Sequence, residues 1–383
     1  MVSVVYVSHT SFENLYPLTK RDRSVSNISI LGKPVAVWMT QSVLDSGFTD
    51  FIVAYPYISQ EVRAAVGERT TLIECEEGSE ILCAQQAISR AKENDIAFIA
   101  GSHMFSSDFL QSALAAWNEA GGKSLAVLVP SQIPHEELAG KIGVEVEFIG
   151  KYVKRAALMG DIGSPYLFTG VMFAERDSIV SRLENSRNLN EVLLKMLNEE
   201  NPSFYIYSGK YSPISSPWQL LEIVKSLLTE TVGMHISSSA KVSPTAILEG
   251  PVIIEDDAVI DHYSIIKGPA YISRGAFVGA HTLLRAGVSV EPYAIIGSGA
   301  EVKRSYIGMR ATIGSHSNVT DSVIGERATL RPLVVTLNFD VHEARKKGEA
   351  YRKRGAIVGE GAIVNGGTAL RPGSIIEPGQ IYP

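Results

Sequence analysis

The sequence predicts an α/β domain followed by a left-handed parallel β-helix, and three observations support this prediction. Segments with strand-like and helix-like patterns alternate along the first half of the chain. In the second half an aliphatic residue recurs every six residues. A small residue stands two positions before most of these aliphatic residues. We therefore expect an α/β domain over 1–231 and a hexapeptide-repeat β-helix over 232–383, with the boundary near 231–237.

The six-residue period is unbroken over twelve positions, Ile236, Val242, Leu248, Ile254, Ile260, Ile266, Ile272, Val278, Leu284, Val290, Ile296 and Val302. An α-helix would repeat every 3.6 residues, and the strands of a β-sandwich would alternate with a period of two. A hexapeptide solenoid fits, because three short strands with their turns form one triangular coil of about eighteen residues. The period then shifts by one residue, is interrupted, and returns over 358–376.

The first half reads as a parallel α/β sheet with a strand-rich insertion. Apolar runs predict strands at 2–7, 51–55, 71–75, 96–100, 124–130, 144–149, 152–158, 166–173 and 204–207. Helical spacing predicts helices at 35–45, 80–92, 109–119, 189–198 and 218–228. Short connections between alternating strands and helices are typical of a Rossmann-like domain.

Composition excludes several classes of function. The chain has 383 residues and a formal net charge of −6, which argues against a nucleic-acid-binding surface. Its two cysteines, Cys75 and Cys83, are too few for a disulfide framework and lack the spacing of a metal site. Residues 1–8 do not resemble a signal peptide, and no apolar run approaches the roughly 20 residues of a membrane span. We expect a cytoplasmic protein with neither nucleic-acid nor membrane partners.

The order of the two domains, with several local matches, resembles the sugar-1-phosphate nucleotidyltransferases that have a β-helix tail. The matching segments are Leu15-Tyr16-Pro17-Leu18-Thr19, Gly32-Lys33-Pro34, Pro217-Trp218 and Leu337-Asn338-Phe339-Asp340. The chain looks most like archaeal bifunctional enzymes that activate sugar phosphates and also acetylate amino-sugar phosphates. The resemblance implies a site where a sugar phosphate attacks a nucleoside triphosphate, with Mg²⁺ held by carboxylates and the triphosphate cradled by a Gly-rich loop.

The residues at the family's nucleotide-site positions depart from this pattern. Thr10 and Phe12 stand where the family has glycines, and Asn14 stands where it has an arginine. Ser102 replaces the first metal-binding aspartate, and the second falls on Pro213. We therefore expect no metal site and predict that nucleotidyl transfer has been lost. Mg²⁺ and acetyl-CoA would be cofactors only if the chain is catalytic.

The β-helix contains candidates for the acetyl-transfer chemistry of the relatives. His316 lies one residue from the position of the family's general base, and Asn338 lies near that of its asparagine. A segment that leaves the solenoid over 341–355 is rich in basic residues that would hold CoA or sugar phosphates, namely Arg345, Lys346, Lys347, Arg352, Lys353 and Arg354. The alternatives are that His316 is a turn residue and that the basic segment is a solvated arm between subunits.

Three functions remain open from the sequence. The first is a non-catalytic or regulatory paralogue in nucleotide-sugar metabolism, which binds an active paralogue or senses a nucleotide sugar or sugar phosphate. The second is an active sugar-1-phosphate nucleotidylyltransferase, amino-sugar-phosphate acetyltransferase, or both, with the acetyl sites between subunits. The third is a purely structural solenoid. We expect a homo-oligomer, a trimer through the β-helix, or a hetero-oligomer with an active paralogue.

Overall fold

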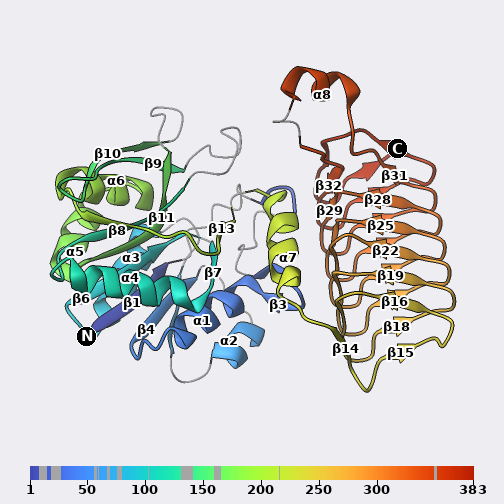
Figure 1. Ribbon diagram of the computed structural model, residues 1–383, viewed down its shortest axis with the longest axis horizontal. Coiled ribbons are helices and arrows are strands. Elements are labelled where there is room, and N and C mark those ends of the chain that lie inside the picture. Colours follow the sequence, from blue (N-terminus) through green and yellow to red (C-terminus); the bar gives the residue numbers. More distant parts are fainter. Residues whose placement is uncertain are drawn as a thin grey trace. The chain divides into compact units, whose positions relative to one another are not determined.

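The computed structural model of the chain describes residues 1–7, 15–18, 27–55, 58, 60–66, 70–75, 80–101, 103–130, 141–158, 165–214, 216–348 and 352–383 (Figure 1). The chain forms two compact units. The α/β unit comprises residues 1–11 and 35–215, and the solenoid unit comprises residues 12–34 and 216–383. The predicted succession of an α/β region and a parallel β-helix is confirmed.

The α/β unit is built on a nine-stranded mixed sheet in the order β5-β4-β1-β6-β11-β8-β12-β10-β9. The strands are β1 (Val2–Val7), β4 (Phe51–Tyr55), β5 (Thr70–Glu74), β6 (Asp95–Ala100), β8 (Leu125–Pro130), β9 (Ile142–Glu147), β10 (Tyr152–Leu158), β11 (Tyr166–Glu175) and β12 (Ser203–Ile206). Strands β5, β4, β1 and β6 are parallel to one another, and β11 runs antiparallel to β6. Fully buried strands such as β4 explain the continuous apolar runs of the sequence.

Six helices belong to this unit: α1 (Val35–Asp45), α2 (Gln60–Val66), α3 (Glu80–Arg90), α4 (Ser107–Glu119), α5 (Arg176–Glu184) and α6 (Leu189–Glu199). Four match predicted helices, whereas α2 and α5 were not predicted. Helix α5 has only two buried residues, Ile179 and Leu183, so its sequence lacks a clear apolar stripe. A further two-stranded sheet pairs β7 (His103–Phe105) with β13 (Tyr211–Pro213).

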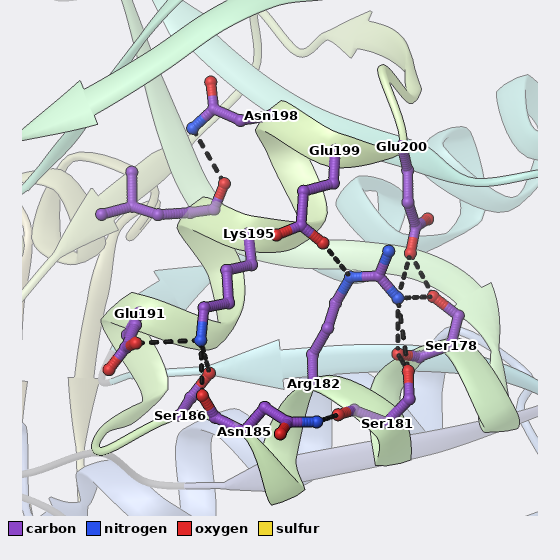
Figure 2. Close-up of polar contacts among 11 residues, drawn as sticks. Ser178, Ser181, Arg182, Asn185, Ser186, Glu191, Lys195, Asn198, Glu199 and Glu200 are labelled. Atoms are coloured by element: carbon purple, nitrogen blue, oxygen red, sulfur yellow. Dashed lines mark hydrogen bonds and ion pairs between the residues drawn. The ribbon is translucent and has the colours of Figure 1, made fainter.

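A polar network joins α5 to α6 (Figure 2). The Arg182 guanidinium lies 3.1 Å from the carboxylate of Glu200 and 3.5 Å from that of Glu199. Glu200 also accepts a hydrogen bond from Ser178. Asn198 continues the network to the sheet, because its amide exchanges hydrogen bonds with the backbone of Ala156 on β10. These contacts fix α5, which buries only two residues of its own, against α6.

The solenoid contains three parallel sheets, one on each side of a triangular coil. The covered face consists of β14 (Met234–Ile236), β17 (Val252–Ile254), β20 (Ala270–Ile272), β23 (Val288–Val290), β26 (Tyr306–Ile307), β29 (Val323–Ile324), β32 (Ala356–Val358) and β35 (Ser374–Ile376). The flat face consists of β15 (Lys241–Val242), β18 (Val259–Ile260), β21 (Phe277–Val278), β24 (Ile295–Ile296), β27 (Thr312–Ile313), β30 (Thr329–Leu330), β33 (Ile363–Val364) and β36 (Ile381–Tyr382). The charged face consists of β16 (Ile247–Glu249), β19 (Ile265–Lys267), β22 (Leu283–Arg285), β25 (Glu301–Lys303), β28 (Asn318–Thr320), β31 (Val335–Thr336) and β34 (Ala369–Leu370).

One strand from each face makes a coil, and we number the coils 1 to 8 from β14 onward. Coil 8 consists of β35 and β36 alone. The aliphatic residues of the six-residue period form the buried core, as Ile260, Val278 and Ile296 show in coils 2 to 4. The small residues two positions earlier, such as Ala258, Ala276 and Ala294, are also buried because the interior of the triangle is narrow. The predicted inward stack is therefore confirmed. The interruption of the period lies between coils 6 and 7, where α8 (Val341–Lys347) stands clear of the stacked coils (Figure 1).

The covered face is shielded by two segments of its own unit. Helix α7 (Gln219–Thr229) packs against β23 and β26. The hairpin of β2 (Ser29–Ile30) and β3 (Lys33–Pro34) is held by Glu291, which accepts hydrogen bonds from the backbone nitrogens of Leu31 and Gly32, each at 2.9 Å. Gly32 has φ +74°, and an added Cβ would lie 2.3 Å from the Tyr271 hydroxyl. Residues 27–34 thus belong to the solenoid, although they directly precede α1 in the sequence.

None of the described helices is both long and apolar enough to cross a membrane.

Candidate functional site

The topology of the α/β unit marks one edge of its sheet as the place for a ligand. After β1 the chain adds β4 and β5 on one side of β1, and then returns to place β6 on the other side. In open parallel sheets, ligands bind outside the carboxyl ends of the strands where the order reverses in this way. The carboxyl ends of β1 and β6 meet there, because the Gly101 nitrogen donates a 3.1 Å hydrogen bond to the Val7 carbonyl. Thr10, Phe12, Asn14 and Ser102, which we predicted as degenerate nucleotide-site positions, lie outside the described residues.

His103 and Tyr211 form a buried pair next to this edge. The His103 Nε2 atom lies 2.8 Å from the Ala100 carbonyl, which can only accept, so this nitrogen donates. The other ring nitrogen, Nδ1, lies 2.8 Å from the Tyr211 hydroxyl. That hydroxyl also lies 3.0 Å from the Thr169 carbonyl. Burial raises the pKa of Tyr211, which keeps the phenol protonated and able to donate.

Two glycines make room for the imidazole. Gly101 has φ +110°, and an added Cβ would lie 2.8 Å from His103 Nε2. Gly170 has φ +79°, and an added Cβ would lie 2.2 Å from the Ala100 carbonyl oxygen. Both positions therefore require glycine for backbone conformation as well as for space. This arrangement could not be predicted from the sequence, because 108 residues separate His103 from Tyr211.

Strand β13 includes the position to which the resemblance assigns the second metal-binding aspartate, and β7 begins directly after the position of the first in the sequence. Strands β7 and β13 pair in an antiparallel register that sets Pro213 opposite His103, the residue after Ser102. Neither Ser102 nor Pro213 has a carboxylate. Among the described residues, no group of three or more His, Cys, Asp or Glu side chains is arranged to hold a metal ion. A Mg²⁺ ion would therefore have no carboxylate ligand from either of these two positions.

A lysine stands toward the same end of the sheet. Lys141 directly precedes β9, whose Gly143 pairs with Leu167 on β11, two residues before Thr169. Burial lowers the pKa of the Lys141 amine to about 8, because loss of hydration disfavours the charged form. A bound anion at this edge would favour the protonated amine and would raise its pKa again. Lys141 is thus a candidate for binding a phosphate, and sequence analysis did not single it out.

Cys75 and Cys83 are joined by a disulfide, with their Cα atoms 5.5 Å apart. The bond links the residue after β5 to the first turns of α3, in the region where the family reads the nucleotide base. A count of two cysteines did not predict this pairing. The disulfide fixes the start of α3 relative to the sheet edge.

The solenoid places the two predicted acetyl-transfer residues at different corners. His316 lies between β27 and β28, is exposed, and adopts φ +57° with its ring against the space left by Gly299. Asn338 follows β31, and its amide donates a hydrogen bond to the buried carboxylate of Asp321. Asp321 also accepts from Arg304. The chain does not bring His316 and Asn338 together within one coil corner, and their role in catalysis stays a prediction.

The basic segment is anchored at its carboxyl end by two contacts between cations and aromatic rings. The Lys353 amine lies 5.7 Å from the centre of the Phe339 ring, and the Arg354 guanidinium lies 5.6 Å from that of Trp218. Within the segment, Lys346 pairs with Glu343 at 3.2 Å. Arg345 and Arg352 are exposed, whereas the side chain of Lys347 lies outside the described residues. The predicted binding of CoA or sugar phosphates by these residues stays a prediction.

Comparisons with known proteins give this chain no family. No protein-family model matches its sequence, and a search of curated proteins found no match.

Proposed function

We propose that this chain is a non-catalytic relative of the sugar-1-phosphate nucleotidyltransferases and acts as a binding or regulatory subunit in nucleotide-sugar metabolism. One observation supports this proposal most directly. The position that the resemblance assigns to the second metal-binding aspartate is a proline, Pro213 on β13, and the position of the first, directly before β7 in the sequence, is a serine. A sheet edge of this topology still provides a ligand cleft by its strand order, so binding does not depend on those carboxylates.

The chemistry of the edge also favours binding over transfer. Phosphoryl chemistry of this family needs a cation to neutralise the charge that develops as pyrophosphate leaves. The His103 imidazole is already engaged on both nitrogens, by the Ala100 carbonyl and the Tyr211 hydroxyl. Lys141 remains as a basic group that would neutralise part of the charge of a phosphate. This set suits the recognition of a sugar phosphate or a nucleotide sugar more than the cleavage of a triphosphate.

Calorimetric titration tests the binding part of this proposal. The purified chain is titrated without added metal with sugar-1-phosphates and nucleoside-diphosphate sugars, one at a time. We expect at least one of these ligands to bind, and the Lys141→Met variant to bind it about tenfold more weakly or worse, since one charged contact to phosphate is lost.

Lys154→Met is the matched control, because Lys154 is an exposed lysine on β10. This variant should bind the ligand with unchanged affinity. If no ligand of the panel binds, or if both lysine variants bind as tightly as the unmodified chain, the proposed site on the sheet edge is wrong.

A further inference from the structure

The three faces of the solenoid differ in what covers them. On the covered face, the outward residues of coils 3 to 5, Tyr271, Ser289 and Tyr306, are all buried beneath other parts of the solenoid unit. The charged face presents ion pairs, with Lys267 3.2 Å from Glu249 and Arg285 2.6 Å from Glu301. The flat face has neither a cover nor a row of ion pairs among its described residues.

The flat face is apolar and smooth at its centre. Its outward strand residues in coils 2 to 7 are Val259, Phe277, Ile295, Thr312, Thr329 and Ile363. Phe277 and Ile295 expose 36% and 45% of their surface, which is high for large apolar residues at the middle of a sheet. The position that follows each strand is glycine in coils 3, 4 and 5, at Gly279, Gly297 and Gly314. An added Cβ at each of these glycines would lie within 2.7 Å of the backbone of the next coil, so glycine at this corner allows the coils to stack.

At the corner that follows the strands of this face, charged residues stand on both sides of coil 4. The position that is glycine in coils 3 to 5 is Asp261 in coil 2 and Arg331 in coil 6. At the adjacent corner, Tyr263 of coil 2 and Leu333 of coil 6 expose 57% and 58% of their surface. An acid and a base, and two large apolar residues, thus stand at equal distances of two coils from Ile295. Beyond these, Lys241 of coil 1 is the one further charged outward residue among the described strands of the flat face.

We propose that the flat face binds the flat face of a second copy of this chain, with the two solenoids antiparallel about a two-fold axis at coil 4. Ile295 then lies against Ile295 of the second copy. Asp261 of each chain lies opposite Arg331 of the other, and Tyr263 lies opposite Leu333, so each contact is made twice. A parallel two-fold arrangement would not bring Asp261 against Arg331, because these residues lie in different coils and each coil would then meet the same coil of the second copy.

This pairing is independent of the function proposed for the α/β unit, since it uses residues of the solenoid alone. It differs from the trimer expected by resemblance, because an isologous contact closes after two copies. The apolar centre supplies attraction, and the charges at its two ends set the direction and register of pairing.

Exchanging the two charges tests the pairing. The variants are Asp261→Arg, Arg331→Asp and the double variant with both changes. Each position accepts the new residue, because Arg331 and Asp261 occupy equivalent corners of the same repeat. Sedimentation equilibrium measures the mass and the dissociation constant at physiological salt. Arg155→Asp, at an exposed position of β10, is the control for a change of net charge.

The unmodified chain and the Arg155→Asp control should have the mass of two chains. Each single variant should dissociate about tenfold more readily, because like charges then meet twice in the dimer. The double variant, and an equal mixture of the two single variants, should regain the affinity of the unmodified chain. A one-chain or three-chain mass for the unmodified protein would overturn the proposal, and so would single variants without effect or a mixture that dissociates as readily as they do.

Discussion

The solenoid and the α/β sheet place the residues that determine their properties in opposite ways. In the solenoid, the same pattern of aliphatic and small residues recurs in every coil, and each coil buries its core against its neighbours. In the α/β unit, one sheet edge gathers residues from distant parts of the sequence, as His103 and Tyr211 show. A repeated core pattern tolerates substitutions on the outer surface of the solenoid. A site made by a few residues is altered by the substitution of any one of them.

This difference separates the residues that maintain the fold from those that a ligand site would use. The buried strands β1, β4 and β6 keep their apolar side chains, so the sheet retains its order. Pro213, at a position that the resemblance assigns to a metal-binding aspartate, lies on β13, outside the nine-stranded sheet. The core and the site of an α/β domain are thus specified by different residues.

The largest effect we predict comes from the core of the solenoid. Ile296 is fully buried at the middle coil, so Ile296→Ala should lower the free energy of unfolding of the solenoid by about 3 to 4 kcal/mol through lost burial and a cavity. Denaturant unfolding, followed by hydrogen exchange in both units, would show protection lost over coils 3 to 5 and retained in β1 and β6. An equal loss of protection in β1 and β6 would contradict two separately stabilised units.

A smaller effect should be confined to the α/β unit. Reduction of the Cys75–Cys83 disulfide frees a chain segment with a sequence separation of 8 residues. The loop-closure estimate for such a segment is about 2 to 3 kcal/mol of unfolding free energy. Unfolding with and without a reductant measures the loss. The double variant Cys75→Ser/Cys83→Ser should not respond to the reductant, and an unmodified chain that is equally insensitive would show that the bond does not form in solution.

The smallest effect is a dependence of stability on pH at Glu291. Burial raises the pKa of this carboxyl above its usual 4.5, against the opposing hydrogen bonds from Ser289 and Gly32. The folded chain then binds the proton more tightly than the unfolded chain. The contribution of Glu291 is therefore fully present below the unfolded pKa and is lost as pH rises through the folded pKa.

The unfolding free energy of the unmodified chain should accordingly fall by up to about 1.4 kcal/mol per pH unit within that window, relative to Glu291→Gln. Thermal unfolding of both proteins over a series of pH values measures this slope. Parallel pH profiles for the two proteins would show that Glu291 does not titrate differently in the folded state.

Local patterns allowed most of the fold to be predicted from the sequence. The period of six is a property of neighbouring residues, so Ile260, Val278 and Ile296 identified the solenoid core directly. Helices with a weak stripe, such as α5, escaped prediction because few of their residues are buried. The hairpin of β2 and β3 was also missed, since Glu291, which holds it, lies 260 residues away from Leu31.

The candidate site was predictable only where it could be compared with a family motif. The absence of carboxylates at Ser102 and Pro213 was visible in the sequence, and the structure sets Pro213 of β13 opposite His103 of β7. Nothing local marked His103, Tyr211 or Lys141, because burial and strand pairing create their properties. The pairing of the flat face was likewise not predictable from the sequence. The equal distance of Asp261 and Arg331 from coil 4 becomes evident only once the residues are assigned to coils.

Pyrophosphate release tests the central claim most directly. The purified chain is incubated with Mg²⁺, each common nucleoside triphosphate and a panel of sugar-1-phosphates, and pyrophosphate is measured over time. We predict no release above a protein-free blank from protein that is folded and binds its ligand in calorimetry. Steady turnover with any pair of substrates would contradict the account, and would mean that residues other than those at positions 102 and 213 neutralise the triphosphate.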